Sequence, residues 1–100
     1  MSSYTYTSIQ RSIYQKGLNR IKEYNKKLEK IFQNQKYKEY KIADSKKLSS
    51  YQSKLNQIKN RWNQYSATQE ELIEIERKMD NLLIKAKEEL LELYEERRKK

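Results

Sequence analysis

The chain has 100 residues, of which 35% are hydrophobic and 37% charged, and its formal net charge is +9. A chain this short and polar is at most one small domain with a thin core, and the absence of Pro argues against a sandwich or barrel with many tight turns. It has no Cys for a disulfide framework and no run of about 18 apolar residues that would span a membrane.

The first 22 residues contain four basic side chains, several Ser and Thr, and no acid before Glu23. This composition is typical of an organelle transit peptide. The basic start of a helix explains the same residues more simply, and we favour that interpretation. The lack of Cys is compatible with a reducing compartment, so we expect an intracellular, cytoplasmic protein unless the N-terminus is a targeting segment.

In the first part of the chain, mostly apolar and aromatic residues recur at steps of three and four. This spacing places them on one helical stripe and predicts a first helix over about residues 7–40. A second stripe begins at Leu48, one residue out of phase with the first, which corresponds to a rotation of roughly 100°. We therefore expect a break at about residues 40–47, with Asp44 or Ser45 capping the next helix. The first stripe comprises Tyr14, Gly17, Ile21, Tyr24, Leu28 and Ile31.

The second stripe runs from Leu48 to Leu93 and predicts a helix over about residues 45–98. Thr68 and Glu71 have the form of a capping box, which would place a turn at residues 66–68 and give three helices. The seven-residue register crosses this point undisturbed. We therefore favour an all-α fold in which residues 1–100 form one antiparallel helical hairpin, a coiled coil of two long helices. A small three-helix bundle is the alternative.

Over residues 72–83 the apolar face is wider than the seam of a two-stranded coil, because Ile73, Ile75 and Leu82 flank it. In a hairpin, another copy of the chain or a helical protein partner must cover these residues. In a three-helix bundle the third helix covers them. The predicted helix–helix or partner interface comprises Leu48, Leu55, Ile58, Trp62, Leu72, Ile73, Ile75, Met79, Leu82, Leu83 and Leu90. We expect seven of these to be buried, namely Leu48, Leu55, Ile58, Trp62, Met79, Leu83 and Leu90.

The charge is uneven: residues 1–65 carry 15 basic and 4 acidic side chains, whereas residues 66–100 carry 8 and 10. Basic rows with interleaved Tyr are typical of surfaces that bind nucleic acid, where Lys neutralises phosphates and Tyr stacks on bases. Lys outnumbers Arg 17 to 6, which favours diffuse phosphate contacts over the reading of guanine. The predicted binding residues are Lys16, Arg20, Lys22, Lys26, Lys30, Tyr37, Tyr40, Lys47, Lys54 and Arg61.

The sequence offers little for catalysis, because it contains no His, no Cys and no Gly-rich phosphate loop, and its Glu residues fall on exposed helical faces. We therefore expect no enzymatic activity, cofactor or metal. The predicted function is binding of DNA or RNA with little sequence specificity. The alternative is a structural coiled-coil subunit or adaptor of a larger assembly, whose basic face meets an acidic partner protein.

Overall fold

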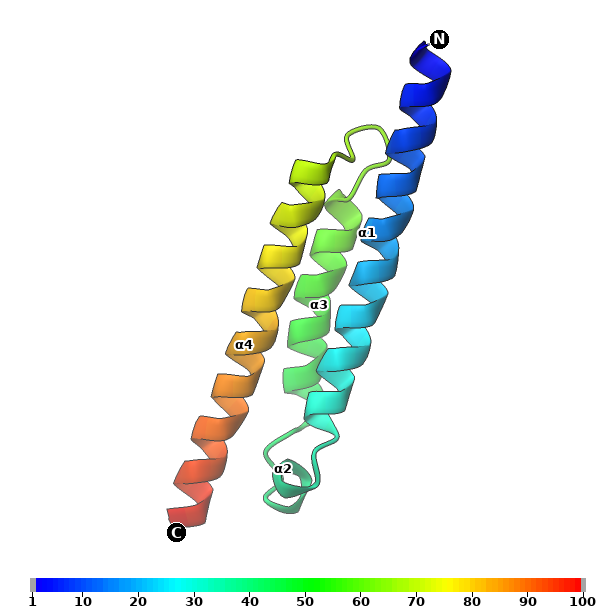
Figure 1. Cartoon of the computed structure of the whole chain (residues 1–100). Coiled ribbons are helices and arrows are strands. Elements are labelled where there is room, and N and C mark those ends of the chain that lie inside the picture. Colours follow the sequence, from blue (N-terminus) through cyan, green and yellow to red (C-terminus); the bar gives the residue numbers. More distant parts are fainter. Residues whose placement is uncertain (1, 100) are drawn as a thin grey trace.

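The structure is a computed structural model that describes residues 2–99, with side chains over residues 8–99. Over this range the protein is all-α, without strands, as predicted (Figure 1). The chain forms a rod of 67 × 18 × 17 Å. The four helices of residues 2–99 are α1 (Ser2–Phe32), α2 (Gln35–Glu39), α3 (Ser45–Arg61) and α4 (Gln69–Lys99).

The three long helices lie side by side, with α3 antiparallel to both α1 and α4 (Figure 1). α1 packs along both of its neighbours, whereas α3 and α4 contact each other less extensively. This arrangement is the three-helix bundle that the sequence left as the alternative. The uninterrupted helix expected over residues 45–98 is wrong, because α3 ends at Arg61 and α4 begins only at Gln69.

The first connection lies close to its predicted position. Asp44 caps α3 as expected: its side chain accepts a hydrogen bond from the Lys47 backbone N–H at 2.8 Å. The first helix, however, ends at Phe32 and not near residue 40. The Asn34 side chain accepts from the Lys36 N–H at 3.1 Å and so starts the short helix α2, because Asn competes for backbone donors that a continuing helix would use.

The second connection is held in place by Trp62, which follows α3 with an extended backbone. Its indole N–H donates to the Tyr14 carbonyl oxygen at 2.8 Å, and its ring stacks on that of Tyr14 at 6.4 Å between centroids. The indole also lies directly on Gly17, where a Cβ atom would overlap it. At the far side of the turn, the Thr68 hydroxyl accepts from the Glu71 N–H at 3.1 Å, which is one half of the expected capping box.

One hydrophobic core runs the length of the bundle. Most of the predicted interface lies in it, and both Ile75 and Leu82 are buried within the bundle of a single chain. Two residues expected to be buried, Leu48 and Ile58, are half-buried at its edge. Ile73 is the exception at 65% exposure, because it borders a hollow between α4 and α1 and does not enter the core. The buried residues of the predicted interface are Leu55, Trp62, Leu72, Ile75, Met79, Leu82, Leu83 and Leu90.

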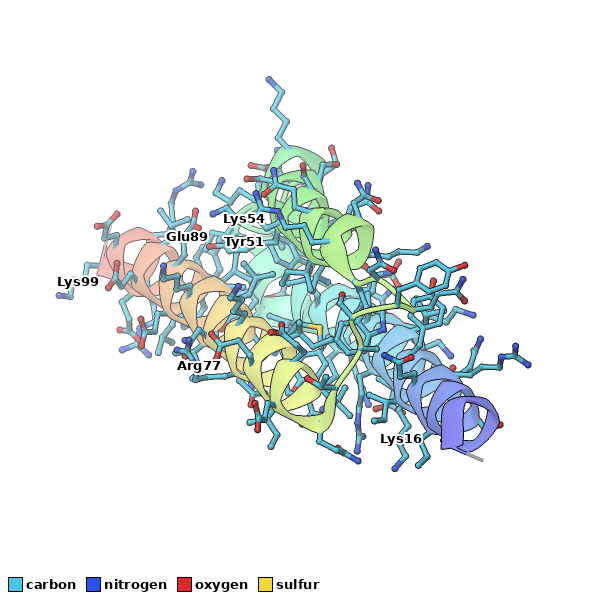
Figure 2. All side chains as sticks on the ribbon, turned by 90° about the horizontal axis from the view of Figure 1, so that it is seen from above. Lys16, Tyr51, Lys54, Arg77, Glu89 and Lys99 are labelled. Atoms are coloured by element: carbon cyan, nitrogen blue, oxygen red, sulfur yellow. The ribbon has the colours of Figure 1, made fainter. Side chains whose placement is uncertain are left out.

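Two tyrosines at the edge of the core form hydrogen bonds from α1 and α3 to α4. The Tyr24 hydroxyl of α1 donates to Asp80, and the Tyr51 hydroxyl of α3 donates to Glu89, a pair that Figure 2 shows in contact between α3 and α4. Burial of the hydroxyl, and then its hydrogen bond to a carboxylate, raise the pKa of both Tyr24 and Tyr51 to about 12.

These two tyrosines are expected to ionise late in an alkaline titration. Because the pKa of each rises from 10.0 in its reference state to about 12 in the fold, each stabilises the fold below pH 10 and loses that contribution as the pH rises towards 12. Ultraviolet absorbance of tyrosinate should show a late phase that Tyr24→Phe and Tyr51→Phe together abolish. Tyr65→Phe, which removes an exposed tyrosine, is the control and should leave that phase intact.

Candidate nucleic-acid interface

The three long helices differ sharply in charge. α3 carries five basic side chains and no acid, and α1 carries seven basic side chains against two acids. α4 carries seven basic side chains against ten acids. Because α4 forms one corner of the triangle seen from above (Figure 2), the side of the bundle made by α1 and α3 is the most basic.

A groove with a volume of about 920 Å³ runs along this basic side. On α1, Lys22 and Lys26 are one helical turn apart and therefore stand on the same face. Across the groove, the Gln52 amide of α3 donates to the Asn25 side-chain oxygen at 3.2 Å. We call this surface the α1/α3 groove; its lining residues are Leu18, Ile21, Lys22, Asn25, Lys26, Glu29, Ser49, Gln52, Ser53, Asn56 and Lys59.

The groove combines cations with neutral hydrogen-bonding side chains. Lys22, Lys26 and Lys59 line it against one acid, Glu29. Ser, Asn and Gln side chains lie between them, and such groups donate hydrogen bonds to phosphate oxygens in protein–nucleic acid contacts. Lys59 was not among the predicted residues, although it shares a helical face with Gln52 and Asn56 and stands in a segment without acids.

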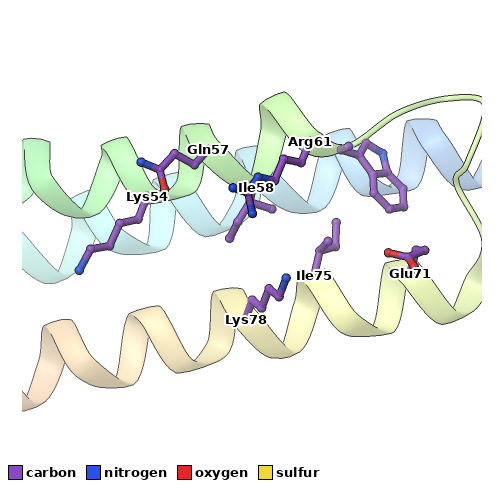
Figure 3. A pocket seen from close by; sticks show the side chains of 8 residues that line it. Lys54, Gln57, Ile58, Arg61, Glu71, Ile75 and Lys78 are labelled. Carbon is purple, nitrogen blue, oxygen red and sulfur yellow. The ribbon is translucent and has the colours of Figure 1, made fainter.

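The predicted row of Lys47, Lys54 and Arg61 faces the other side of α3. Lys54 and Arg61 line a smaller groove of about 280 Å³ between α3 and α4, together with Glu71 and Lys78 of α4 (Figure 3). Lys47 forms a 2.8 Å salt bridge with Asp44 at the start of α3. This row therefore lies towards the more acidic helix and does not extend the α1/α3 groove.

The remaining predicted cations of α1 lie towards α4. Arg20 forms salt bridges with Glu23 at 3.2 Å and Glu76 at 3.1 Å, and its hydrogen bond to Glu23 is the largest cause of the raised pKa of its guanidinium. Lys16 lines the same hollow between α1 and α4. Lys30 lines another, next to Leu83 and Lys87. Of the eight predicted cations, only Lys22 and Lys26 line the α1/α3 groove.

The two tyrosines expected to stack on bases do not form an open stacking surface. Tyr37 is buried, contrary to expectation, and Tyr40 is only 37% exposed. Both rings pack edge-on against Tyr94 of α4, at 6.0 Å and 5.4 Å between centroids, and Lys36 lies over the Tyr94 ring. The physical reason is that α2 folds onto the end of α4, and nothing in the local sequence indicates this contact.

Most other described tyrosines also contact side chains of the bundle and are therefore not free to stack on bases. Tyr14 stacks on Trp62, while Tyr24 and Tyr51 donate to carboxylates of α4. Tyr65, in the turn between α3 and α4, is 78% exposed and stands outside the groove. Over the described side chains, the lining of the α1/α3 groove includes no aromatic ring, so the groove offers contacts to phosphate and sugar but no platform for bases.

Within residues 2–99, the side chains of His, Cys, Asp and Glu form no group of three or more that would hold a metal ion. In the same range, none of the helices has the length and apolar character needed to cross a bilayer. Comparisons with protein-family models, curated proteins and solved structures found no match to this chain.

Proposed function

We propose that the protein binds nucleic acid through backbone phosphates in the α1/α3 groove, with little sequence preference. The observation that carries this proposal is the acid-free helix α3 lying beside the lysines of α1. Lys22 and Lys26 on one wall and Lys59 on the other give the groove an excess of positive charge, which attracts a phosphate backbone whatever its sequence.

The lining of the groove favours a duplex over a single strand as the ligand. Proteins that bind single strands without sequence preference stack bases on aromatic side chains, and the described lining of the groove offers none. Lys, Ser, Asn and Gln side chains instead contact phosphate and sugar, which a duplex presents along its outside. Contacts of this kind position the protein without reading bases, so affinity is expected to be similar for unrelated sequences.

Two triple variants test the site, because each removes three exposed cations from a different groove. The first is Lys22→Gln, Lys26→Gln and Lys59→Gln in the α1/α3 groove; the control is Lys54→Gln, Arg61→Gln and Lys78→Gln between α3 and α4. The first should weaken duplex binding. It should also reduce the slope of log affinity against log salt concentration by almost three, because each lost phosphate contact accounts for about 0.9 of that slope. The control should change that slope much less. Fluorescence anisotropy with two unrelated duplexes measures both.

Equal losses in the two triple variants would show that binding is spread over the surface and would overturn the groove as its site. No affinity of the unaltered protein for duplex or single strand at low salt would overturn nucleic-acid binding altogether. The remaining function would then be that of a structural subunit or adaptor, whose basic side contacts an acidic protein.

A further inference from the structure

The exposed side of α4 carries a second seven-residue repeat, which borders α1 at Ile73, Asp80 and Lys87. Seven exposed residues follow one another at steps of three and four, so they form one stripe along the helix. Ile73, Ile84 and Leu91 in this stripe are 65%, 50% and 45% exposed, although the side chains of α4 that face α1 and α3 supply much of the core. We call it the outer stripe; it consists of Glu70, Ile73, Arg77, Asp80, Ile84, Lys87 and Leu91.

The order of side chains in the outer stripe is self-complementary. Consider two copies of α4 laid antiparallel, with Ile73 of one copy facing Ile84 of the other. One helical turn further, towards the middle of the paired segment, Arg77 of the first copy faces Asp80 of the second. One turn in the other direction sets Glu70 against Lys87. The two-fold axis repeats every pair, which gives two Ile–Ile contacts and four pairs of opposite charge. A parallel arrangement in register would instead place each charge against its like, which is unfavourable.

We propose that two copies of this protein associate through an antiparallel pairing of their α4 helices along the outer stripe. Such a contact is isologous and closes at a dimer. The exposed isoleucines supply the apolar contact, and the charges set direction and register. The charges of the stripe remain available to a second copy: Asp80 accepts from Tyr24 through one carboxylate oxygen, and Arg77, bonded to Glu74, keeps further donors.

The charge distribution of the bundle also favours this face for self-association. α1 and α3 are strongly basic and repel their counterparts in another copy, whereas α4 carries both signs. The outer stripe points away from the α1/α3 groove, and Figure 2 shows Arg77 on the outer side of α4. The dimer therefore leaves both grooves open on its opposite sides, so dimerisation and nucleic-acid binding are separable.

Charge exchange between Glu70 and Lys87 tests the pairing and its register. Glu70→Lys alone sets Lys against Lys87 of the second copy, and Lys87→Glu alone sets Glu against Glu70. Each should weaken the dimer by roughly tenfold or more, because attraction becomes repulsion at two symmetric sites. An equimolar mixture of the two single variants should recover dimer as a heterodimer, and the double variant should recover the homodimer. Sedimentation velocity without nucleic acid measures all four.

Matched controls lie elsewhere on α4, where Glu96→Lys and Lys85→Glu make the same charge changes at exposed positions outside the stripe. These should leave the dimer unchanged, as should the triple variant of the α1/α3 groove, whose failure to bind duplex is a separate result. A wild-type protein that stays monomeric up to the millimolar range would overturn the proposal. A dimer that the two single variants and the controls affect equally would also overturn it, because it must then use another face.

Discussion

The Trp62→Ala variant is expected to lose about 3–5 kcal/mol of unfolding free energy, because it deletes a buried aromatic side chain. It also removes the 2.8 Å hydrogen bond from the indole to the Tyr14 carbonyl and the stacking of the two rings. For a domain of this size each kcal/mol corresponds to about 4–8 °C, so thermal denaturation followed by circular dichroism should show Tm lower by more than about 12 °C.

The contact between Trp62 and Gly17 predicts that the effect of Gly17→Ala on stability changes sign when Trp62 is removed. Gly→Ala inside a helix ordinarily stabilises by about 0.5–1 kcal/mol. Here a Cβ at residue 17 overlaps the indole, so Gly17→Ala should lower Tm in the wild-type protein. In the Trp62→Ala background the space is open, and the same Gly17→Ala change should raise Tm. A double-mutant cycle without this coupling would contradict the contact.

The affinity of the protein for duplex is expected to fall by about 40-fold between roughly 50 and 200 mM salt, if each of the three groove lysines neutralises one phosphate. The cations of the basic side supply these contacts, because counterions released from the duplex by Lys and Arg carry most of such binding. Arg20 and Lys47 should contribute little, since both are already paired with carboxylates. Anisotropy titrations over a salt series measure the slope.

Two controls accompany the salt series. A single strand of the same length should bind more weakly than the duplex, because the described groove lining has no aromatic side chain for its bases. A second duplex of unrelated sequence should give the same affinity and the same slope. An affinity that does not respond to salt would mean that phosphate contacts do not drive binding.

Local patterns in the sequence predicted that the chain is helical, where α3 begins, and most of the core. Apolar residues at steps of three and four placed Leu55, Met79 and Leu90 on buried faces, and all three are buried. Asp44 was expected to cap a helix and does so. These features depend on residues within about one or two helical turns of one another, so a single sequence contains the information needed to predict them.

The turn between α3 and α4 depends on a contact that the sequence does not display. The seven-residue register continues through residues 62–68, yet the chain leaves the helix there. In this turn Trp62 packs on Gly17, which belongs to another helix, and the Asn63 side chain accepts from the Tyr65 N–H at 2.8 Å. The capping residue Thr68 did indicate a helix start at this point. A motif this short is weaker evidence than an unbroken register, which predicts a continuous helix. Tyr37 and Tyr40 were likewise not predictable from local pattern, because their rings pack against Tyr94, which is distant in the sequence.

The sequence by itself determined that the protein is helical, where its apolar stripes lie and that its first two-thirds are basic. The tertiary structure alone decided which basic residues share a surface. Periodicity gives the angle of each side chain about its own helix axis, but the position of a face in the molecule depends on which helices cover its neighbours. That is why Lys59 joins Lys22 and Lys26 in one groove while Lys54 and Arg61 point towards α4.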